Sequence, residues 1–379
     1  MVQIFHSKKQ NTIITMLSSS ARATKYDYDL ICIGGGSGGI ACAKRASSLH
    51  SRRVLCVERT SKLGGTCVNV GCVPKKVMWT AAHIAHTLRH DAVHYGFDVG
   101  GGSGEDGGGP KFDYAKLKKA RDEYVSRLNG IYASGFASAG VACVYGDCSL
   151  SLLAGGDGDG HAVLVRDPAT GTSTRYTSGG IVIATGGRPH VPCADGDGIA
   201  EHCITSDGFF DMPELPDVAV VVGAGYVAVE LAGVLNSLGS EVHLVVRRGK
   251  ALREFDPMVS DGLDDEMRRD GIFVHRHTGG VSKVVLDPKS NKKNVTLVSG
   301  DAIYGADVVI MAAGRVPNTE NLVVAEGADG EVVDEDGVSW SGNTEGMGLE
   351  ERGVKLSKNG YVVVDEYQNT SVDGVYAIG

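Results

Sequence analysis

Blocks of apolar residues near the start of the chain predict a strand, a helix and a second strand. Residues 28–33, which are apolar apart from Asp29, predict a buried strand, an alanine-rich stretch at 40–48 predicts a helix, and residues 53–57, which are apolar after Arg53, predict the next strand. Mostly apolar strands that alternate with helices are typical of a parallel sheet covered on both faces. This part of the chain therefore predicts a βαβ unit.

The same pattern returns in the second half of the chain. Residues 218–222 and 241–246 predict strands, and residues 229–238 predict the helix between them. Two such units in 379 residues predict an α/β fold with two Rossmann-like, three-layer domains.

A glycine-rich turn joins the first strand to its helix. Gly34, Gly36 and Gly39 have the G-x-G-x-x-G spacing, which allows a sharp bend, a close approach of pyrophosphate and tight helix–strand packing. The helix N-terminus attracts phosphate through its N–H groups and its positive dipole. Glu58 follows Gly39 by 19 residues and can accept hydrogen bonds from a ribose. The first turn therefore suits a nucleotide with unmodified ribose hydroxyls, such as FAD.

The second pattern has a similar turn but ends differently. Residues 223–228 form G-x-G-x-x-A, and the residue 24 positions after Gly223 is Arg247, where the first pattern has an acid. Arg248 follows directly, and Arg253 lies close in sequence. Arginine binds a 2′-phosphate that an acid would repel, so this turn predicts NADPH. The alternative is that these arginines form a solvated strand end.

Cys67 and Cys72 lie between the two patterns, separated by four residues. Residues five apart on a regular helix lie roughly 8 Å from each other, whereas a disulfide needs Cα atoms within about 7 Å. The pair can therefore close only on a distorted segment, which Gly71 permits, and such a bond is reducible. A dithiol beside a nucleotide turn indicates electron transfer between a dinucleotide and a disulfide. The alternative is two buried thiols.

Composition narrows the class of protein. Glycine accounts for 54 residues, about twice the usual frequency. The net charge of −9 argues against nucleic acid as a partner, and no apolar run approaches the roughly 18 residues of a membrane span. The nine cysteines lack the spacing of a secreted disulfide framework, and we expect the seven besides Cys67 and Cys72 to be buried or half-buried thiols.

The first 25 residues contain four cations, several serines and no acid. Either an organellar transit peptide or a disordered leader fits this composition. We therefore expect the protein in the cytosol or in an organelle such as a mitochondrion or plastid.

Several motifs together resemble the flavin disulfide reductases (class I pyridine nucleotide-disulfide oxidoreductases), and within them the glutathione reductases. Residues 64–79, GGTCVNVGCVPKKVMW, are similar to the redox signature of that group, with Lys75 where dihydrolipoamide dehydrogenases usually have serine. Residues 184–187 and 313–318 look like the two crossover strands of the family, and 124–132 like its helix before the second sheet.

The resemblance implies an FAD- and NADPH-dependent glutathione-disulfide reductase with a redox-active Cys67–Cys72 disulfide. Cys72 would face the flavin, Cys67 would attack the substrate, Lys75 would pair with Glu230, and Tyr226 would cover the nicotinamide pocket. The implied FAD residues are Gly34, Gly36, Ser37, Gly38, Glu58, Thr66, Cys67, Lys75, Cys148, Thr185 and Gly186. The implied NADPH residues are Ala224, Gly225, Val227, Glu230, Arg247, Arg253 and Gly314.

Three residues are implied to contact glutathione disulfide: Ser37, Lys44 and Tyr132. Lys44 and Arg45 supply positive charge for this anionic substrate, although both could also be ordinary helix surface. Two other functions stay open, a large-type thioredoxin reductase and a dinucleotide-binding fragment without turnover.

The resemblance also divides the chain. It implies an FAD domain at 26–188, an NADPH domain at 189–316 and a return segment at 317–379. The chain ends before the family's dimerisation domain and its catalytic histidine, so we expect a C-terminally truncated form of a homodimer, with little or no turnover by itself. Residues 98–110 and 326–350 predict inserted surface loops.

Four histidines at 83, 86, 90 and 94 have helical spacing, but no cysteine or glutamate completes a metal signature. We therefore predict no metal site.

Overall fold

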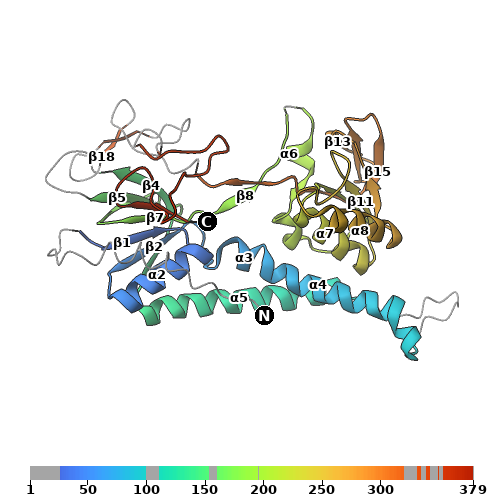
Figure 1. Ribbon diagram of the computed structural model, residues 1–379, viewed down its shortest axis with the longest axis horizontal. Coiled ribbons are helices and arrows are strands. Elements are labelled where there is room, and N and C mark those ends of the chain that lie inside the picture. Colours follow the sequence, from blue (N-terminus) through green and yellow to red (C-terminus); the bar gives the residue numbers. More distant parts are fainter. Residues whose placement is uncertain are drawn as a thin grey trace. The chain divides into compact units, whose positions relative to one another are not determined.

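The computed structural model describes residues 26–99, 111–152, 160–194, 196–319, 331–333, 339–341, 349 and 353–378. The predicted leader and most of the two predicted loops lie outside these ranges. The chain forms two compact units: the first contains 1–69, 126–188 and 316–379, and the second contains 70–125 and 189–315. Each is an α/β unit with a parallel sheet, which confirms the predicted fold class (Figure 1).

The first unit contains a five-stranded parallel sheet in the order β20-β7-β1-β2-β3. Its strands are β1 (Leu30–Ile33), β2 (Val54–Glu58), β3 (Ala142–Tyr145), β7 (Ile181–Ile183) and β20 (Val375–Ala377). Helix α2 (Ser37–His50) connects β1 to β2, and its apolar residues pack with alternate residues of both strands.

A three-stranded antiparallel sheet supplies the third layer of the first unit. It consists of β4 (Asp147–Leu152), β5 (His161–Arg166) and β6 (Ser173–Ser178). Val163 and Val165 of β5 share a buried cluster with Ile31 and Leu55 of the parallel sheet. Both faces of β1 and β2 are therefore covered, which explains why both strands are apolar apart from Glu58 at the end of β2.

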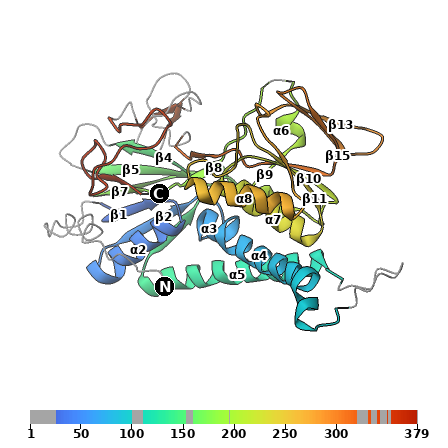
Figure 2. The ribbon, with the colours of Figure 1, turned by 45° about the vertical axis from the view of Figure 1, so that its right-hand side comes forward.

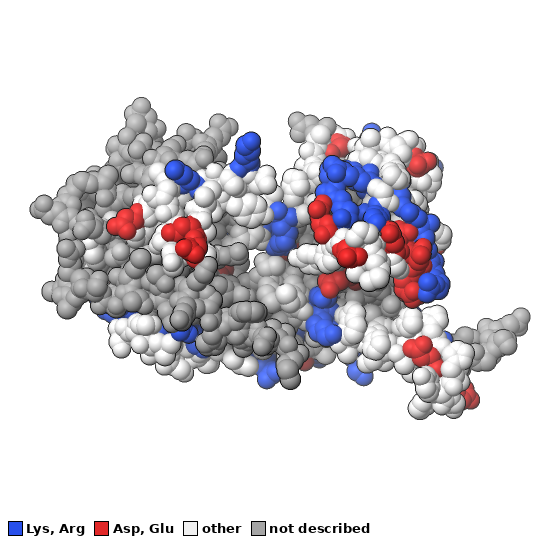
Figure 3. Space-filling model, viewed as in Figure 1, with Lys and Arg blue, Asp and Glu red and all other residues white. Residues whose placement is uncertain are grey.

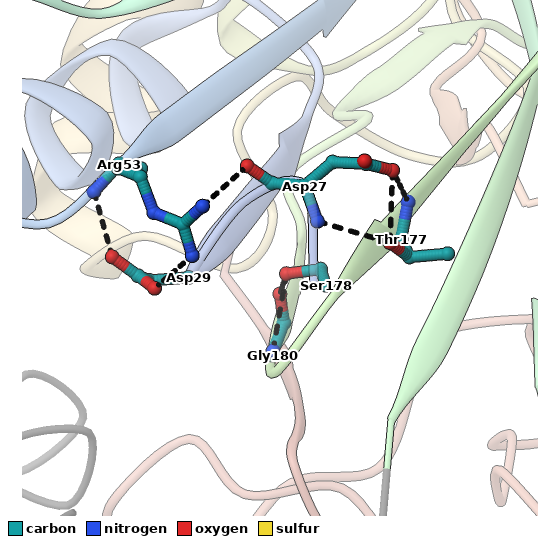
Figure 4. Close-up of polar contacts among 6 residues, drawn as sticks. All are labelled: Asp27, Asp29, Arg53, Thr177, Ser178 and Gly180. Atoms are coloured by element: carbon teal, nitrogen blue, oxygen red, sulfur yellow. Dashed lines mark hydrogen bonds and ion pairs between the residues drawn. The ribbon is translucent and has the colours of Figure 1, made fainter. Parts of the chain in front are cut away.

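Polar contacts fix the point where the chain enters β1 (Figure 4). The Asp29 carboxylate accepts hydrogen bonds from the Arg53 backbone N–H and guanidinium, each at 2.9 Å. Asp27 accepts from the Thr177 N–H and hydroxyl, each at 2.8 Å. Burial raises the pKa of Asp29, but the Arg53 hydrogen bonds and charge outweigh it and lower the pKa below its ordinary value. These contacts hold β1 in register with β2 and β6.

The second unit has a parallel sheet in the order β12-β11-β10-β16-β9. Its strands are β9 (Ile204–Thr205), β10 (Val218–Val222), β11 (Glu241–Val245), β12 (Phe273–His275) and β16 (Val308–Met311). Helix α7 (Tyr226–Leu238) connects β10 to β11, α8 (Pro257–Arg269) connects β11 to β12, and α6 (Ile199–His202) precedes β9 (Figure 2).

An antiparallel sheet again covers one face of the second unit. It consists of β13 (Val281–Leu286), β14 (Lys293–Leu297) and β15 (Ala302–Ala306), and it shares a buried cluster with the parallel sheet. The other face packs against α7. The segments β8 (Gly187–Pro189) and β17 (Arg315–Pro317), where the chain crosses between units, pair as a two-stranded ribbon, and β18 (Glu331–Val333) pairs with β19 (Ser339–Ser341).

Helix α4 (Cys72–His86) belongs to the second unit, although the predicted domain range placed it in the first. Met78 and Ala82 of α4 are buried in the same cluster as α7, which explains the difference. The long helix α5 (Tyr114–Ala139) begins in this unit, where the Arg121 side chain is 1% exposed. Its guanidinium donates to the carbonyl oxygen of Phe210 at 2.5 Å, at the end of a 3₁₀ turn, η3 (Gly208–Asp211).

The histidine-rich segment is helical but not regular. After α4 the chain continues as a π-helical turn, η1 (Thr87–Asp91), and a 3₁₀ turn, η2 (Ala92–Tyr95). Among the described residues, no group of three histidine, cysteine, aspartate or glutamate side chains is arranged to hold a metal ion. Within those same residues, no helix is both long enough and apolar enough to cross a bilayer.

Candidate functional site

The glycine-rich turn of the first unit forms a close strand–helix junction. Gly34 follows β1 with a φ of 108°, and Gly36 is the N-cap residue of α2, which has no side-chain cap. A Cβ atom at Gly39 would lie 1.9 Å from the carbonyl oxygen of Gly34. The turn therefore leaves the N–H groups of α2 available to a phosphate, with Ser37 exposed and Gly38 half-buried beside them.

Glu58 stands at the end of β2, and its side chain is fixed. The residue is 8% exposed, and one carboxylate oxygen accepts the Gly35 N–H at 2.7 Å. The other oxygen accepts the Thr60 N–H and hydroxyl at 2.9 and 3.0 Å. Each carboxylate oxygen can accept further hydrogen bonds, and the contact of Glu58 with a ribose stays a prediction.

The redox segment is attached to this same turn. The Gly64 N–H donates to the carbonyl oxygen of Gly35 at 2.8 Å. A Cβ atom at Gly65 would lie 2.6 Å from the Cα of Gly36, so only glycine allows the two loops to approach this closely. Helix α3 (Gly65–Asn69), which carries Thr66 and Cys67, therefore starts directly beside the first glycine-rich turn.

The helix breaks between the two cysteines, as their spacing predicted. Helix α3 ends at Asn69, α4 begins at Cys72, and Gly71 between them has φ −144° and ψ −124°. Cys67 is half-buried and Cys72 is exposed, and the structure contains both in the thiol form. The disulfide between them stays a prediction.

Lys75 and Glu230 form the ion pair that the resemblance implies. Lys75 on α4 donates from its ammonium group to Glu230 on α7 at 2.7 Å, with both side chains partly buried. The contact joins residues 155 positions apart within the second unit. The role of Lys75 beside the flavin stays a prediction.

The second glycine-rich turn repeats the geometry of the first. Gly223 follows β10, and a Cβ atom there would lie 2.3 Å from the carbonyl oxygen of Ala312. Gly225 is the N-cap residue of α7, again without a side-chain cap. Ala224 accepts the Leu252 N–H at 2.8 Å, and Val227 is half-buried. The start of α7 is therefore also available to a phosphate.

Exposed groups surround this second turn. Tyr226 begins α7 with 60% of its surface exposed, Arg247 and Arg253 are exposed, and Gly314 is exposed with a φ of 129°. In Figure 3, Lys and Arg side chains gather on the part of the molecule where Figure 1 places α7, α8 and β13, with acidic side chains among them. Cations and acids are therefore mixed on this face, and Arg253 itself pairs with Glu254 at 2.8 Å. The role of Arg247 and Arg253 toward an anionic nucleotide stays a prediction.

The remaining implied FAD residues lie within the first unit. Thr185 and Gly186 follow β7, where their carbonyl oxygens accept hydrogen bonds from Asn318 at 3.0 and 2.9 Å. Cys148 is half-buried in β4, and burial, with the charge of Asp147 second, raises the pKa of its thiol well above the ordinary value. The contact of its backbone with FAD, which the resemblance implies, stays a prediction.

The implied substrate residues are less clearly grouped. Lys44 is half-buried on α2, and a Cβ atom at Gly135 of α5 would lie 3.1 Å from its ammonium nitrogen. Tyr132 packs against the buried cluster under α2, whereas Ser37 is exposed at the helix start. Their contact with glutathione stays a prediction.

Asn129 on α5 holds the redox segment in place, a role that the sequence did not reveal. Its amide donates to the carbonyl oxygen of Leu63 at 2.6 Å and to Asn69 at 2.9 Å. An asparagine inside a long helix is the only local signal, because it is a poor helix former and often has another partner.

Comparison with known proteins decides the family. A model described as pyridine nucleotide-disulphide oxidoreductase matches residues 28–339 and 323–379. A glutathione reductase from Schizosaccharomyces pombe is 36% identical over 361 residues, which cover 93% of this chain. The chain belongs to the pyridine nucleotide-disulphide oxidoreductase family. It spans 66% of the length of the yeast relative.

Pyridine nucleotide-disulphide oxidoreductases of the glutathione reductase type use FAD and NADPH, the pair that the sequence predicted. The two glycine-rich turns fit these nucleotides, because both leave a helix N-terminus uncapped. In both, the glycine that follows the strand, Gly34 or Gly223, has no room for a Cβ atom. The first ends in a buried, oriented glutamate and the second in exposed arginines. The assignment of individual residues to each nucleotide stays a prediction.

In an oxidoreductase of this family, losing the Lys75 charge should slow the reaction itself. We expect Lys75→Gln to lower kcat roughly 10- to 100-fold, because a charge-assisted hydrogen bond contributes about 1.5–3 kcal/mol. The KM for the disulfide should change much less. Lys76→Gln is the matched control, since the Lys76 ammonium lies over the Trp79 ring, 3.5 Å from its centroid. Equal kcat values in the two variants would contradict this role.

Proposed function

We propose that the protein is an NADPH-dependent glutathione-disulfide reductase that acts through Cys67 and Cys72. The main support is the attachment of the CVNVGC segment to the first glycine-rich turn, through the Gly64 N–H and the close approach of Gly65 to Gly36. The identity to a glutathione reductase supports the choice of substrate. We also propose, from the family resemblance, that the working form is a homodimer.

FAD, when bound, supplies a two-electron carrier between the nicotinamide and the cysteines. The Cys67 thiolate attacks one sulfur of glutathione disulfide, forms a mixed disulfide and releases one glutathione. Cys72 then attacks the Cys67 sulfur, releases the second glutathione and closes the Cys67–Cys72 bond. The net change is that NADPH, a proton and one disulfide become NADP⁺ and two thiols.

Charge supports separate roles for Lys75 and Lys44. The Lys75–Glu230 pair keeps a positive charge on α4, three residues after Cys72, where it stabilises a thiolate. Lys44 adds a cation on α2 that suits an anionic tripeptide disulfide.

The test compares two oxidised substrates. The homodimeric working form loaded with FAD should oxidise NADPH when glutathione disulfide is added, and oxidised thioredoxin should give little or no turnover. Consumption of NADPH with thioredoxin alone would reject the glutathione assignment and favour the thioredoxin reductase alternative.

The choice of nucleotide should depend on Arg247. We expect Arg247→Ala to raise the KM for NADPH roughly 10- to 100-fold and to leave the KM for NADH unchanged, because arginine contacts the 2′-phosphate by a charge-assisted hydrogen bond. Arg269→Ala, at the exposed end of α8, is the control. If the KM for NADPH and the KM for NADH rose equally, Arg247 would not recognise the 2′-phosphate.

A further inference from the structure

Four cysteines of the first unit gather at one face of its parallel sheet, three on strands and one on the helix that covers them. The proposed reaction uses none of the four. Cys32 on β1 is directly opposite Cys56 on β2, and Cys56 is directly opposite Cys143 on β3. Cys42 lies on α2, the helix that covers this face (Figure 1). All four belong to or pack against the same buried cluster. Three neighbouring strands therefore each place one thiol in a single row.

The thiols of Cys56 and Cys143 differ in exposure and in acidity. Cys56 is fully buried, whereas Cys143 is half-buried on β3, which is an edge strand of the sheet. A hydrogen bond from the Cys56 thiol is the largest influence on Cys143, and it lowers the Cys143 pKa against the opposing effect of burial. The same bond, together with burial, raises the pKa of Cys56.

The neighbouring tyrosine supports this arrangement. Tyr145 also hydrogen-bonds Cys143, and burial together with that neighbour raises the pKa of Tyr145 to about 12, so the phenol keeps its proton. Cys143 therefore has two donors that favour its thiolate form. A partly accessible thiol of lowered pKa beside a buried partner is the arrangement of a reactive dithiol.

The register also suits a bond between the two sulfurs. Neighbouring strands lie about 4.7–4.9 Å apart, inside the roughly 4.4–6.8 Å that a disulfide requires between Cα atoms. Directly opposed residues point to the same face of the sheet, so both sulfurs lie on the side that α2 covers. A disulfide would join β3 to β2 two residues before Glu58.

We propose that Cys56 and Cys143 form a second redox-active dithiol, separate from Cys67 and Cys72, that small disulfides such as glutathione disulfide oxidise. The Cys143 thiolate attacks one sulfur of the small disulfide and displaces one thiol. The Cys56 thiol then loses its proton, attacks the Cys143 sulfur and displaces the second thiol. Two protein thiols become one disulfide, and one small disulfide becomes two thiols.

Oxidation of this dithiol would depend on the ratio of small disulfides to thiols in the surrounding solution. It would add a covalent bond to β2, the strand that carries Glu58. The proposal stands apart from the proposed function, because it uses glutathione disulfide only as an oxidant and needs neither nucleotide. The test can therefore use a variant that cannot reduce glutathione disulfide through Cys67 and Cys72.

The experiment uses the full chain with Cys67→Ser and Cys72→Ser. The native protein is incubated with glutathione disulfide, alkylated in denaturant, digested without reductant and analysed by mass spectrometry. We expect two fewer alkylated cysteines and a linked peptide pair containing Cys56 and Cys143, which dithiothreitol separates. Adding Cys143→Ser should abolish the loss, whereas Cys193→Ser should not. Cys193 is the control because it is exposed. The prediction that all cysteines besides Cys67 and Cys72 are buried or half-buried was therefore wrong for Cys193.

Three results would overturn the proposal. One is full alkylation of Cys56 and Cys143 after incubation with excess glutathione disulfide. The second is a stable glutathione adduct on Cys143, and the third is a new bond that joins Cys32 to Cys42. Because Cys143 is at the sheet edge, its replacement should leave the fold intact, and a circular dichroism spectrum of the variant checks this.

Discussion

In the homodimeric working form, replacing Cys67 by serine is expected to lower the NADPH-dependent reduction of glutathione disulfide by roughly 10⁴-fold or more, because the variant has no nucleophile for the substrate. The reduction of bound FAD by NADPH should persist, since the proposed nicotinamide site uses other residues. Stopped-flow absorbance measures flavin reduction, and steady-state NADPH consumption measures turnover in the same preparation. The two rates should therefore separate by several orders of magnitude.

Cys193→Ser is the matched control for this variant. Cys193 lies in an exposed segment after β8, so its replacement should leave both rates unchanged. Turnover that survives in the Cys67 variant would show that another thiol attacks the substrate. Loss of flavin reduction in that variant would show instead that the substitution disturbs the first glycine-rich turn, beside which α3 begins.

A single methyl group at Gly39 is expected to prevent stable FAD binding. The Cβ atom of Gly39→Ala would lie 1.9 Å from the carbonyl oxygen of Gly34, and backbone atoms cannot yield as a flexible side chain can. Relieving this clash would move α2 away from β1 and open the turn. We expect the free energy of unfolding to fall by about 3 kcal/mol or more. The ratio of flavin to protein absorbance and urea unfolding of the apoprotein measure the two effects.

Gly130→Ala provides the control in the same unit. Gly130 lies within α5, and a Cβ atom there would meet nothing within 4 Å. Alanine is favoured over glycine inside helices by about 1 kcal/mol, so this variant should bind FAD normally and be slightly more stable. If both glycine variants retained FAD equally, the first turn would not be the tight junction described here.

Both glycine-rich turns were predictable because their signals are local. The spacing of Gly34, Gly36 and Gly39 fixes the bend and the helix start within six residues, and the apolar runs on either side predict the strands. The break between Cys67 and Cys72 was predictable for the same reason, since Gly71 lies between two cysteines that a regular helix would separate.

Features that depend on distant parts of the chain were not predictable from local patterns. The inclusion of 70–125 in the second unit results from packing of Met78 against α7, which follows more than 140 residues later. The Lys75–Glu230 contact was expected only through family resemblance. The row of Cys32, Cys56 and Cys143 depends on the strand order, because β3 is far from β2 in sequence. Burial of the Arg121 side chain has no local signal either.

The central proposal is that electrons pass from NADPH through FAD to Cys67 and Cys72. Its most direct test is to count the thiols that NADPH generates. The protein loaded with FAD is treated anaerobically with about one equivalent of NADPH, alkylated, and mapped by mass spectrometry. We expect two new alkylated cysteines, Cys67 and Cys72, together with a long-wavelength absorbance band from a thiolate beside the flavin. Bleaching of the flavin with unchanged alkylation of both cysteines would contradict it.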